Sequence, residues 1–201
     1  MTIDELLALA PFDAVQVGVA KDILAQFSAA GVGELGLAAV VNAWAESMLD
    51  PLVCTGRTPW GADRGFGPIP GGEDSCGLFQ LNAAPAAAGA GMTVEERQDP
   101  RTNTARIIEV VKSPSGDRLR GMVASGAPLG DLIAVFTEDI ERPANRVQEG
   151  LDRAEMAGEW GWPVYDSSWA LPVAVATAGM LPLLAIVLVG ALGLAYFTVK
   201  A

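Results

Sequence analysis

The C-terminal part of the chain is an apolar segment without a charged residue from Ser167 to Val199. A helix needs about 20 residues to cross the hydrocarbon core of a bilayer, so this segment is long enough for one span. Trp169 and Tyr196 lie near its two ends, where aromatic side chains favour the membrane interface. A buried core helix is the alternative. The segment predicts a transmembrane helix at 169–199, preceded at 160–168 by a short linker or by the approach of the chain to the membrane interface.

Residues 1–159 are predicted to form one mainly α domain, because their apolar residues recur at helical spacing. The Gly- and Pro-rich stretch from Pro51 to Ser75 interrupts this pattern and is expected to be irregular, with room for a small hairpin. The predicted fold is therefore mainly α with a minimal, irregular β region. The expected helices are 13–29, 34–48, 99–112, 118–124, 128–136 and 143–156.

Composition narrows the chemistry that the domain can perform. The chain has a net charge of −11 and no histidine, which excludes Ser-His and Cys-His catalytic sets and His-ligated metal sites. Its few Lys and Arg residues are not clustered, so nothing in the charge pattern favours nucleic acid as a partner. We expect no metal and no cofactor. Catalysis by carboxyl groups is the main chemistry left.

Glu46 is the candidate catalytic residue, near the end of the expected helix 34–48. Pro51 limits this helix, so Glu46 lies in its last turn. The negative end of the helix and apolar neighbours both favour the neutral carboxylic acid there, which is the form that donates a proton in glycosidic bond cleavage. An ordinary solvated glutamate is the alternative. The same helix has a predicted buried stripe of Leu37, Val41, Trp44 and Met48.

Four short motifs follow one another in a recognisable order. Glu46-Ser47 is followed by Gly77-Leu78-Phe79-Gln80-Leu81-Asn82, then by Asp99-Pro100 with Asn103, and then by Glu141-Arg142-Pro143. This order resembles the lysozyme-like superfamily of lytic transglycosylases, goose-type lysozymes and phage tail lysozymes. The resemblance covers residues 35–146. It implies a lysozyme-like α+β domain that cleaves peptidoglycan.

The resemblance also implies roles for individual residues. Glu46 would be the general acid that protonates the oxygen between N-acetylmuramic acid and N-acetylglucosamine. Gln80 would hold a sugar amide or hydroxyl, Gly77 would let the backbone approach the glycan, and Phe79 would pack beneath a sugar ring or else in the core. Ser47 would orient the acid or contact the substrate. The implied substrate-binding residues are Ser47, Gly77, Phe79, Gln80, Asn82 and Asn103.

Members of this superfamily either hydrolyse the bond or form an anhydro end, and the sequence leaves both mechanisms open. Inverting hydrolysis needs a second carboxylate at about 6.5–9.5 Å from the first. Asp63, Glu73 and Asp74 are candidates, with loop-solubilising charges as the alternative. Phe79 stands where transglycosylases more often have Met.

Cys54 and Cys76 flank the irregular stretch. A disulfide between them would join the ends of this stretch beside the expected cleft and would contribute roughly 3 kcal/mol. The alternative is a pair of reduced thiols that behave as small hydrophobic residues.

The chain begins without a basic n-region, so we expect no signal peptide. A C-terminal anchor normally leaves the preceding domain in the cytoplasm, whereas peptidoglycan lies on the other side. A phage virion avoids this conflict by bringing the enzyme from outside. We therefore expect a membrane-anchored virion lysin that acts as the phage enters the cell, with peptidoglycan, a lipid bilayer and other virion or envelope proteins as partners. A bacterial envelope enzyme is one alternative. A structural virion membrane protein with an inactive, glycan-gripping lysozyme-like domain is the other.

Overall fold

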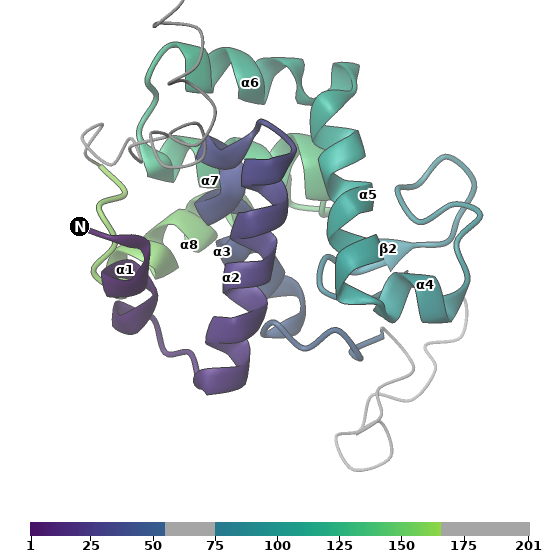
Figure 1. The fold of residues 1–201 in the computed structure, drawn as a ribbon. Helices are drawn as coiled ribbons and strands as arrows, with labels where there is room; N and C mark the ends of the chain where they lie inside the picture. The colour runs from purple at the N-terminus through teal and green to yellow at the C-terminus, as the bar shows by residue number, and fades with distance from the viewer. Residues whose placement is uncertain (55–74, 166–201) are drawn as a thin grey trace, which may run out of the picture. The chain divides into compact units, whose positions relative to one another are not determined.

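Helix α3 (Gly36–Ser47) runs through the centre of the domain, and every residue from Leu37 to Ala43 is buried. The computed structural model describes residues 1–54 and 75–165. Around α3 pack α2 (Ala14–Ala29), α7 (Leu129–Phe136) and α8 (Arg146–Glu159) (Figure 1). Because α3 is buried on all sides, polar groups along it must find partners inside the protein.

Capping residues fix where several helices begin. Capping boxes open α1 (Ile3–Leu9), α2 and α4 (Val94–Gln98), in each case with a Thr or Asp cap and a Glu or Gln three residues later. Helix α5 (Pro100–Lys112) begins with Asp99 as its cap and a proline in its first turn, where the missing N–H costs nothing.

The C-terminal half continues with η2 (Pro114–Gly116) and α6 (Asp117–Ala124) before α7. The end of α7 widens into a π-helical turn, η3 (Thr137–Glu141), which stops at Arg142 with a φ of +57°. Helix α8 then packs along α7 and η3. This turn places Glu141 at the end of an interrupted helix, an arrangement that is frequent at functional sites.

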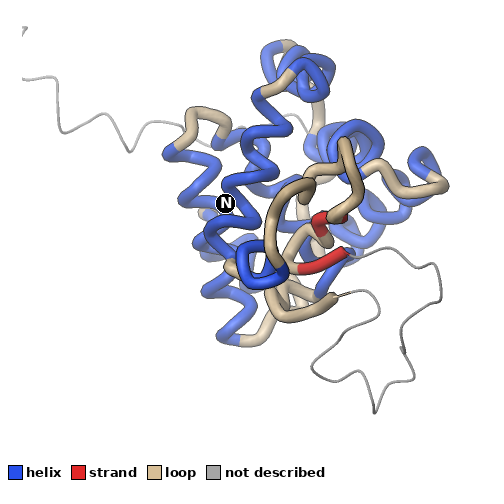
Figure 2. The backbone as a smooth tube through the Cα atoms, turned by 90° about the vertical axis from the view of Figure 1, so that its right-hand side faces the viewer, coloured by secondary structure: helices blue, strands red, loops and turns tan. Residues whose placement is uncertain are grey.

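The β structure is one short antiparallel pair. Strand β1 (Ser75–Cys76) pairs with β2 (Leu81–Asn82) (Figure 2). Cys76 lies opposite Leu81, and a bridge joins Cys54 to Cys76. Strand β2 and α4 lie beside α5, on the side of the domain away from α1 and α8 (Figure 1). The described residues thus confirm a mainly helical fold with a minimal two-stranded sheet.

The predicted buried stripe of α3 is wrong at its last member. Leu37 and Val41 are fully buried, but Met48 is 55% exposed. Met48 ends the helix in the left-handed region at a φ of +55°, which turns its side chain away from the stripe. Trp44 is half-buried and packs against Phe12 and Trp160, with ring centroids 4.8 and 5.9 Å away.

The first part of the predicted linker packs on the domain instead. Trp162 and Val164 are buried, the indole N–H of Trp162 donates to the Leu6 carbonyl at 2.8 Å, and the Val164 carbonyl accepts from the Gly130 amide at 2.8 Å. The predicted transmembrane helix at 169–199 lies outside the described residues. Within 1–54 and 75–165, no helix has the length and apolarity needed to cross a bilayer.

Candidate active site

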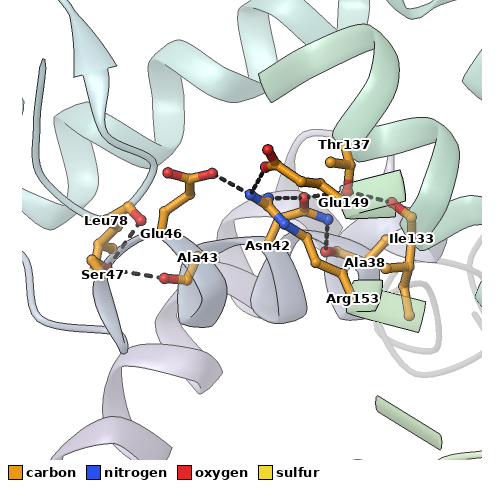
Figure 3. Close-up of polar contacts among 10 residues, drawn as sticks. All are labelled: Ala38, Asn42, Ala43, Glu46, Ser47, Leu78, Ile133, Thr137, Glu149 and Arg153. Carbon is orange, nitrogen blue, oxygen red and sulfur yellow. Dashed lines mark hydrogen bonds and ion pairs between the residues drawn. The ribbon is translucent and has the colours of Figure 1, made fainter. Parts of the chain in front are cut away.

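Glu46 lies in the last turn of α3, as the sequence predicts, and its side chain is 22% exposed. Its carboxylate accepts a hydrogen bond from the guanidinium of Arg153 on α8, and the two groups form an ion pair (Figure 3). Arg153 is itself 9% exposed. The contact is charge-assisted, and nothing in the sequence indicated it.

A polar network that includes Arg153 and Asn42 joins α8, α3 and η3. A second nitrogen of the Arg153 guanidinium donates to Asn42 Oδ1 at 2.6 Å, and Glu149 lies 3.6 Å away on the same helix (Figure 3). Asn42 Oδ1 also accepts from the Thr137 hydroxyl at 2.8 Å, while its amide group donates to the Ala38 carbonyl at 2.9 Å. This network satisfies the buried polar side chain of α3 and fixes the guanidinium beside Glu46.

Ser47 joins α3 to the hairpin. Its side chain is buried, and its hydroxyl lies within hydrogen-bonding distance of the Ala43 carbonyl at 2.9 Å and the Leu78 carbonyl at 3.0 Å (Figure 3). Ser47 places the Gly77–Asn82 segment next to the end of the helix that carries Glu46.

Gly77 is required by the protein's own packing. Its φ is +85°, and a Cβ there would lie 1.9 Å from the Arg97 carbonyl oxygen and 2.3 Å from Asn103 Nδ2. Arg97 and Asn103 already occupy the space where a side chain of residue 77 would lie. The glycine is therefore explained by packing inside the protein rather than by the expected approach of a glycan. Only a residue without a side chain fits.

Asn103 is fully buried and holds the hairpin turn in place. Its amide nitrogen donates to the carbonyls of Arg97 at 2.6 Å and Cys76 at 3.2 Å, and its Oδ1 accepts from the Phe79 amide at 3.1 Å. The Phe79 side chain is 1% exposed and lies 6.4 Å from the ring centroid of Phe136. Both residues thus support the site from within the core, which is the alternative role that the sequence left for Phe79.

A cavity of about 480 Å³ opens beside the hairpin. Gln80 and Asn82 line it from the hairpin side, and Glu141 lines it from the end of η3. Gln80 is half-buried, and its amide donates to the Val53 and Gly77 carbonyls at 2.9 Å each. The other lining residues are Phe79, Leu81, Ala86, Ala87, Ala88, Arg106, Ile107, Glu109, Val110, Ser113, Ser115, Ile140 and Arg142.

Glu141 is the residue that the sequence reasoning missed as part of the site. Its Oε1 is buried and has no hydrogen-bond partner among the described residues. Burial raises the pKa of the Glu141 carboxyl well above its ordinary value, the charge of Glu46 raises it further, and Arg153 acts in the opposite direction. Its place in the Glu-Arg-Pro motif was an available signal, but the motif alone did not indicate a chemical role.

Cys54 and Cys76 form a disulfide, which is the first of the two alternatives that the sequence left open. The bond joins the two ends of the segment 55–74 at the edge of β1. The three candidate second carboxylates, Asp63, Glu73 and Asp74, fall in that segment and lie outside the described residues.

Comparisons of the chain with protein-family models, curated proteins and solved structures gave no match.

Proposed function

We propose that this chain cleaves the β-1,4 bond between N-acetylmuramic acid and N-acetylglucosamine in peptidoglycan, with Glu46 as its catalytic carboxyl group. The observation that carries the proposal is the link from Glu46 through Ser47 to the hairpin that lines the cavity. Ser47 holds the hairpin at the end of α3 next to Glu46, and Gln80 and Asn82 of that hairpin line the cavity, whose lining does not include Glu46. Such an arrangement suits recognition of a polar sugar and protonation of its leaving oxygen.

The cavity has a suitable size and chemistry for part of a glycan strand. Ligand sites typically enclose roughly 300–1,000 Å³ and combine apolar walls with a few polar groups. Here Ile107 and Val110 supply apolar wall, while Gln80, Asn82 and Arg106 supply amide and guanidinium groups. Sugar rings present both apolar faces and hydroxyl groups, so they can pack on the apolar wall and form hydrogen bonds with the polar groups.

The setting proposed for this activity is a virion membrane. The apolar residues 169–199 would anchor the enzyme, and a phage would bring it to the wall from outside. In this proposal the lysin acts locally as the virion enters the cell, and its partners are peptidoglycan, lipid and other virion proteins.

One observation favours a second function, that of an inactive domain which only grips glycan. Arg153 holds the Glu46 carboxylate in an ion pair, and a carboxylate cannot donate a proton. For cleavage, bound glycan must weaken this pair or a proton must reach Glu46 from a neighbour.

Incubation of full-length protein in detergent with purified murein separates the two functions. Soluble muropeptides show cleavage, and their masses distinguish reducing ends from anhydro ends. Retention of protein on murein without any soluble product favours the gripping domain. Neither product nor retention contradicts both functions.

A further inference from the structure

The Glu141 carboxyl is an unused hydrogen-bonding group in the wall of the cavity. Its Oε1 is buried without a partner in the described part of the chain, and no described residue donates to its Oε2, which is not buried. Buried polar atoms of native proteins nearly always have a hydrogen-bond partner, so an exception at a cavity wall needs a physical reason. A ligand that supplies the missing partner is such a reason.

The arginines that line the cavity do not supply this partner. Arg142 donates to the Ser115 hydroxyl at 2.9 Å, and Arg106 is paired with Glu109 at 2.6 Å. Burial also raises the pKa of the Glu141 carboxyl well above its ordinary value, which favours the protonated form. A neutral carboxyl group donates through its O–H and accepts through its carbonyl oxygen, and rotation about the last side-chain bond turns either oxygen toward the cavity.

Asn82 of β2 supplies a second unused group, from the hairpin side of the same cavity. Its Oδ1 accepts from the Ala84 amide at 2.7 Å, whereas its Nδ2 has no hydrogen-bond partner among residues 1–54 and 75–165. The cavity thus has an unused amide donor on one wall and an unused carboxyl group on another.

Much of the surface around these two groups is apolar. Among the apolar residues that line the cavity are Ala86, Ala87, Ala88, Ile107, Val110 and Ile140. An amide group in a ligand matches this combination, because its carbonyl accepts, its N–H donates and its alkyl substituents pack on apolar surface. A hydroxyl group also donates and accepts, but it brings no alkyl substituent.

We infer that the cavity is a subsite for an amide group of the ligand, and that Glu141 and Asn82 are the residues that hydrogen-bond it. The inference rests on the proposed function for the identity of the ligand. In peptidoglycan such a group has two sources, the acetamido group of an amino sugar and the peptide bonds of the stem peptide. Glu141 is then a specificity-determining residue and takes no part in breaking the glycosidic bond.

Isothermal titration of full-length protein in detergent with three soluble probes tests the subsite. The first is the trimer of N-acetylglucosamine, and the second is cellotriose, in which a hydroxyl replaces each acetamido group. The third is the peptide N-acetyl-L-alanyl-D-isoglutamine. We expect the acetylated trimer or the peptide to bind about tenfold more tightly than cellotriose, and the tighter of the two identifies the source of the amide. Equal affinity for all three probes, or no binding of any, would overturn the inference.

Variants of the two residues assign the hydrogen bonds. Glu141→Leu removes both donor and acceptor and should weaken the preferred probe about tenfold, since one hydrogen bond contributes about 0.5–1.5 kcal/mol. Glu141→Gln keeps a donor and an acceptor in the same shape and should restore the affinity. Asn82→Asp keeps the acceptor for the Ala84 amide but loses the donor, so it should also weaken the preferred probe.

Glu138→Leu is the matched control, because it makes the same change in the same turn but lies outside the cavity lining. Its affinities should match the wild type. Equal weakening in Glu138→Leu and Glu141→Leu, or an equal loss for cellotriose and the preferred probe, would reduce Glu141 to a structural role. If Glu141→Leu does not fold, Asn82→Asp and the three probes on the wild type decide.

The outcomes separate this inference from the proposed function. Release of muropeptides by a wild type that shows no preference for the amide-bearing probes would overturn the subsite and leave the cleavage intact. A preference for those probes without any release of muropeptides would overturn the cleavage and leave the subsite.

Discussion

Arg153 of α8 binds the carboxylate of Glu46 at the end of α3, across 107 residues of sequence. The same guanidinium binds Asn42, one turn earlier on α3. This pairing holds α3 and α8 together at the point where the proposed chemistry takes place.

Replacing Glu46 by Gln should abolish murein cleavage. The amide keeps the shape of the side chain but cannot deliver a proton, and general acid catalysis contributes about 10²–10⁴-fold. Release of soluble muropeptides measures the loss, and the circular dichroism melting curve shows that the domain is still folded. Wild-type rates in this variant would remove Glu46 from the mechanism.

Replacing Arg153 by Met should lower the free energy of unfolding by about 2 kcal/mol. Breaking a fully buried pair costs about 3–5 kcal/mol, but Glu46 is partly solvated and recovers some hydration. Urea denaturation measures the change. Arg118→Met is the control, because its pair with Glu138 is more exposed and should contribute about 0–1 kcal/mol. An equal loss of unfolding free energy in the two variants would show that the Arg153 network stabilises the domain no more than an exposed ion pair does.

Gly77→Ala should destabilise the domain by about 2–5 kcal/mol. The left-handed backbone costs an alanine about 1–2 kcal/mol, and the overlap with the Arg97 carbonyl adds about 1–3 kcal/mol. Gly91→Ala measures the cost of the left-handed backbone alone, since Gly91 has a φ of +80° with open space around it. Chemical denaturation of both variants gives the difference. A Gly77→Ala protein no less stable than Gly91→Ala would show that the backbone at Gly77 can move aside.

The stability of the wild type relative to Glu141→Gln should fall as pH rises above about 4.3. Below that pH, Glu141 is protonated in both the folded and the unfolded chain and contributes no difference. Above it the unfolded chain releases the proton, while burial keeps the pKa of Glu141 raised in the folded protein. The slope approaches at most about 1.4 kcal/mol per pH unit until the folded group also ionises. Thermal melts of both proteins over a pH series measure it, and parallel curves would contradict a raised pKa.

Truncation after Tyr165 should give a protein that needs no detergent and still cleaves murein. The described site residues all precede this point, and the apolar segment 169–199 is removed. Alkaline carbonate extraction of the full-length chain from membranes or particles provides the complementary measurement. Release of the intact chain into the supernatant would contradict a transmembrane anchor.

Local sequence patterns predicted the features that depend on neighbours in the chain. The burial of Leu37 and Val41 in α3, a helix near 99–112 and the position of Glu46 near a helix end all follow from the spacing of apolar residues and from Pro51. The prediction that Met48 belongs to the buried stripe was wrong, because Met48 ends the helix in the left-handed conformation and its side chain points elsewhere. The spacing of apolar residues gives no sign of such a helix end.

Contacts between distant residues could not be predicted in this way. No pattern in α3 indicates that Arg153 will pair with Glu46, and no pattern near Glu141 indicates that its Oε1 will be buried without a partner among the described residues. Asn103 similarly reads as a possible sugar ligand, whereas its amide holds the hairpin turn. These roles depend on how α8, η3 and α5 pack, which is a property of the folded chain.

The Cys54–Cys76 bond makes a closed covalent ring of the chain between those residues. A protease that cuts one peptide bond within 55–75 opens this ring without dividing the molecule. The N-terminal fragment would carry Glu46 and the C-terminal fragment would carry both Arg153 and Glu141, yet the two would remain one covalent species. Only a cut followed by reduction of the disulfide would let the fragments part.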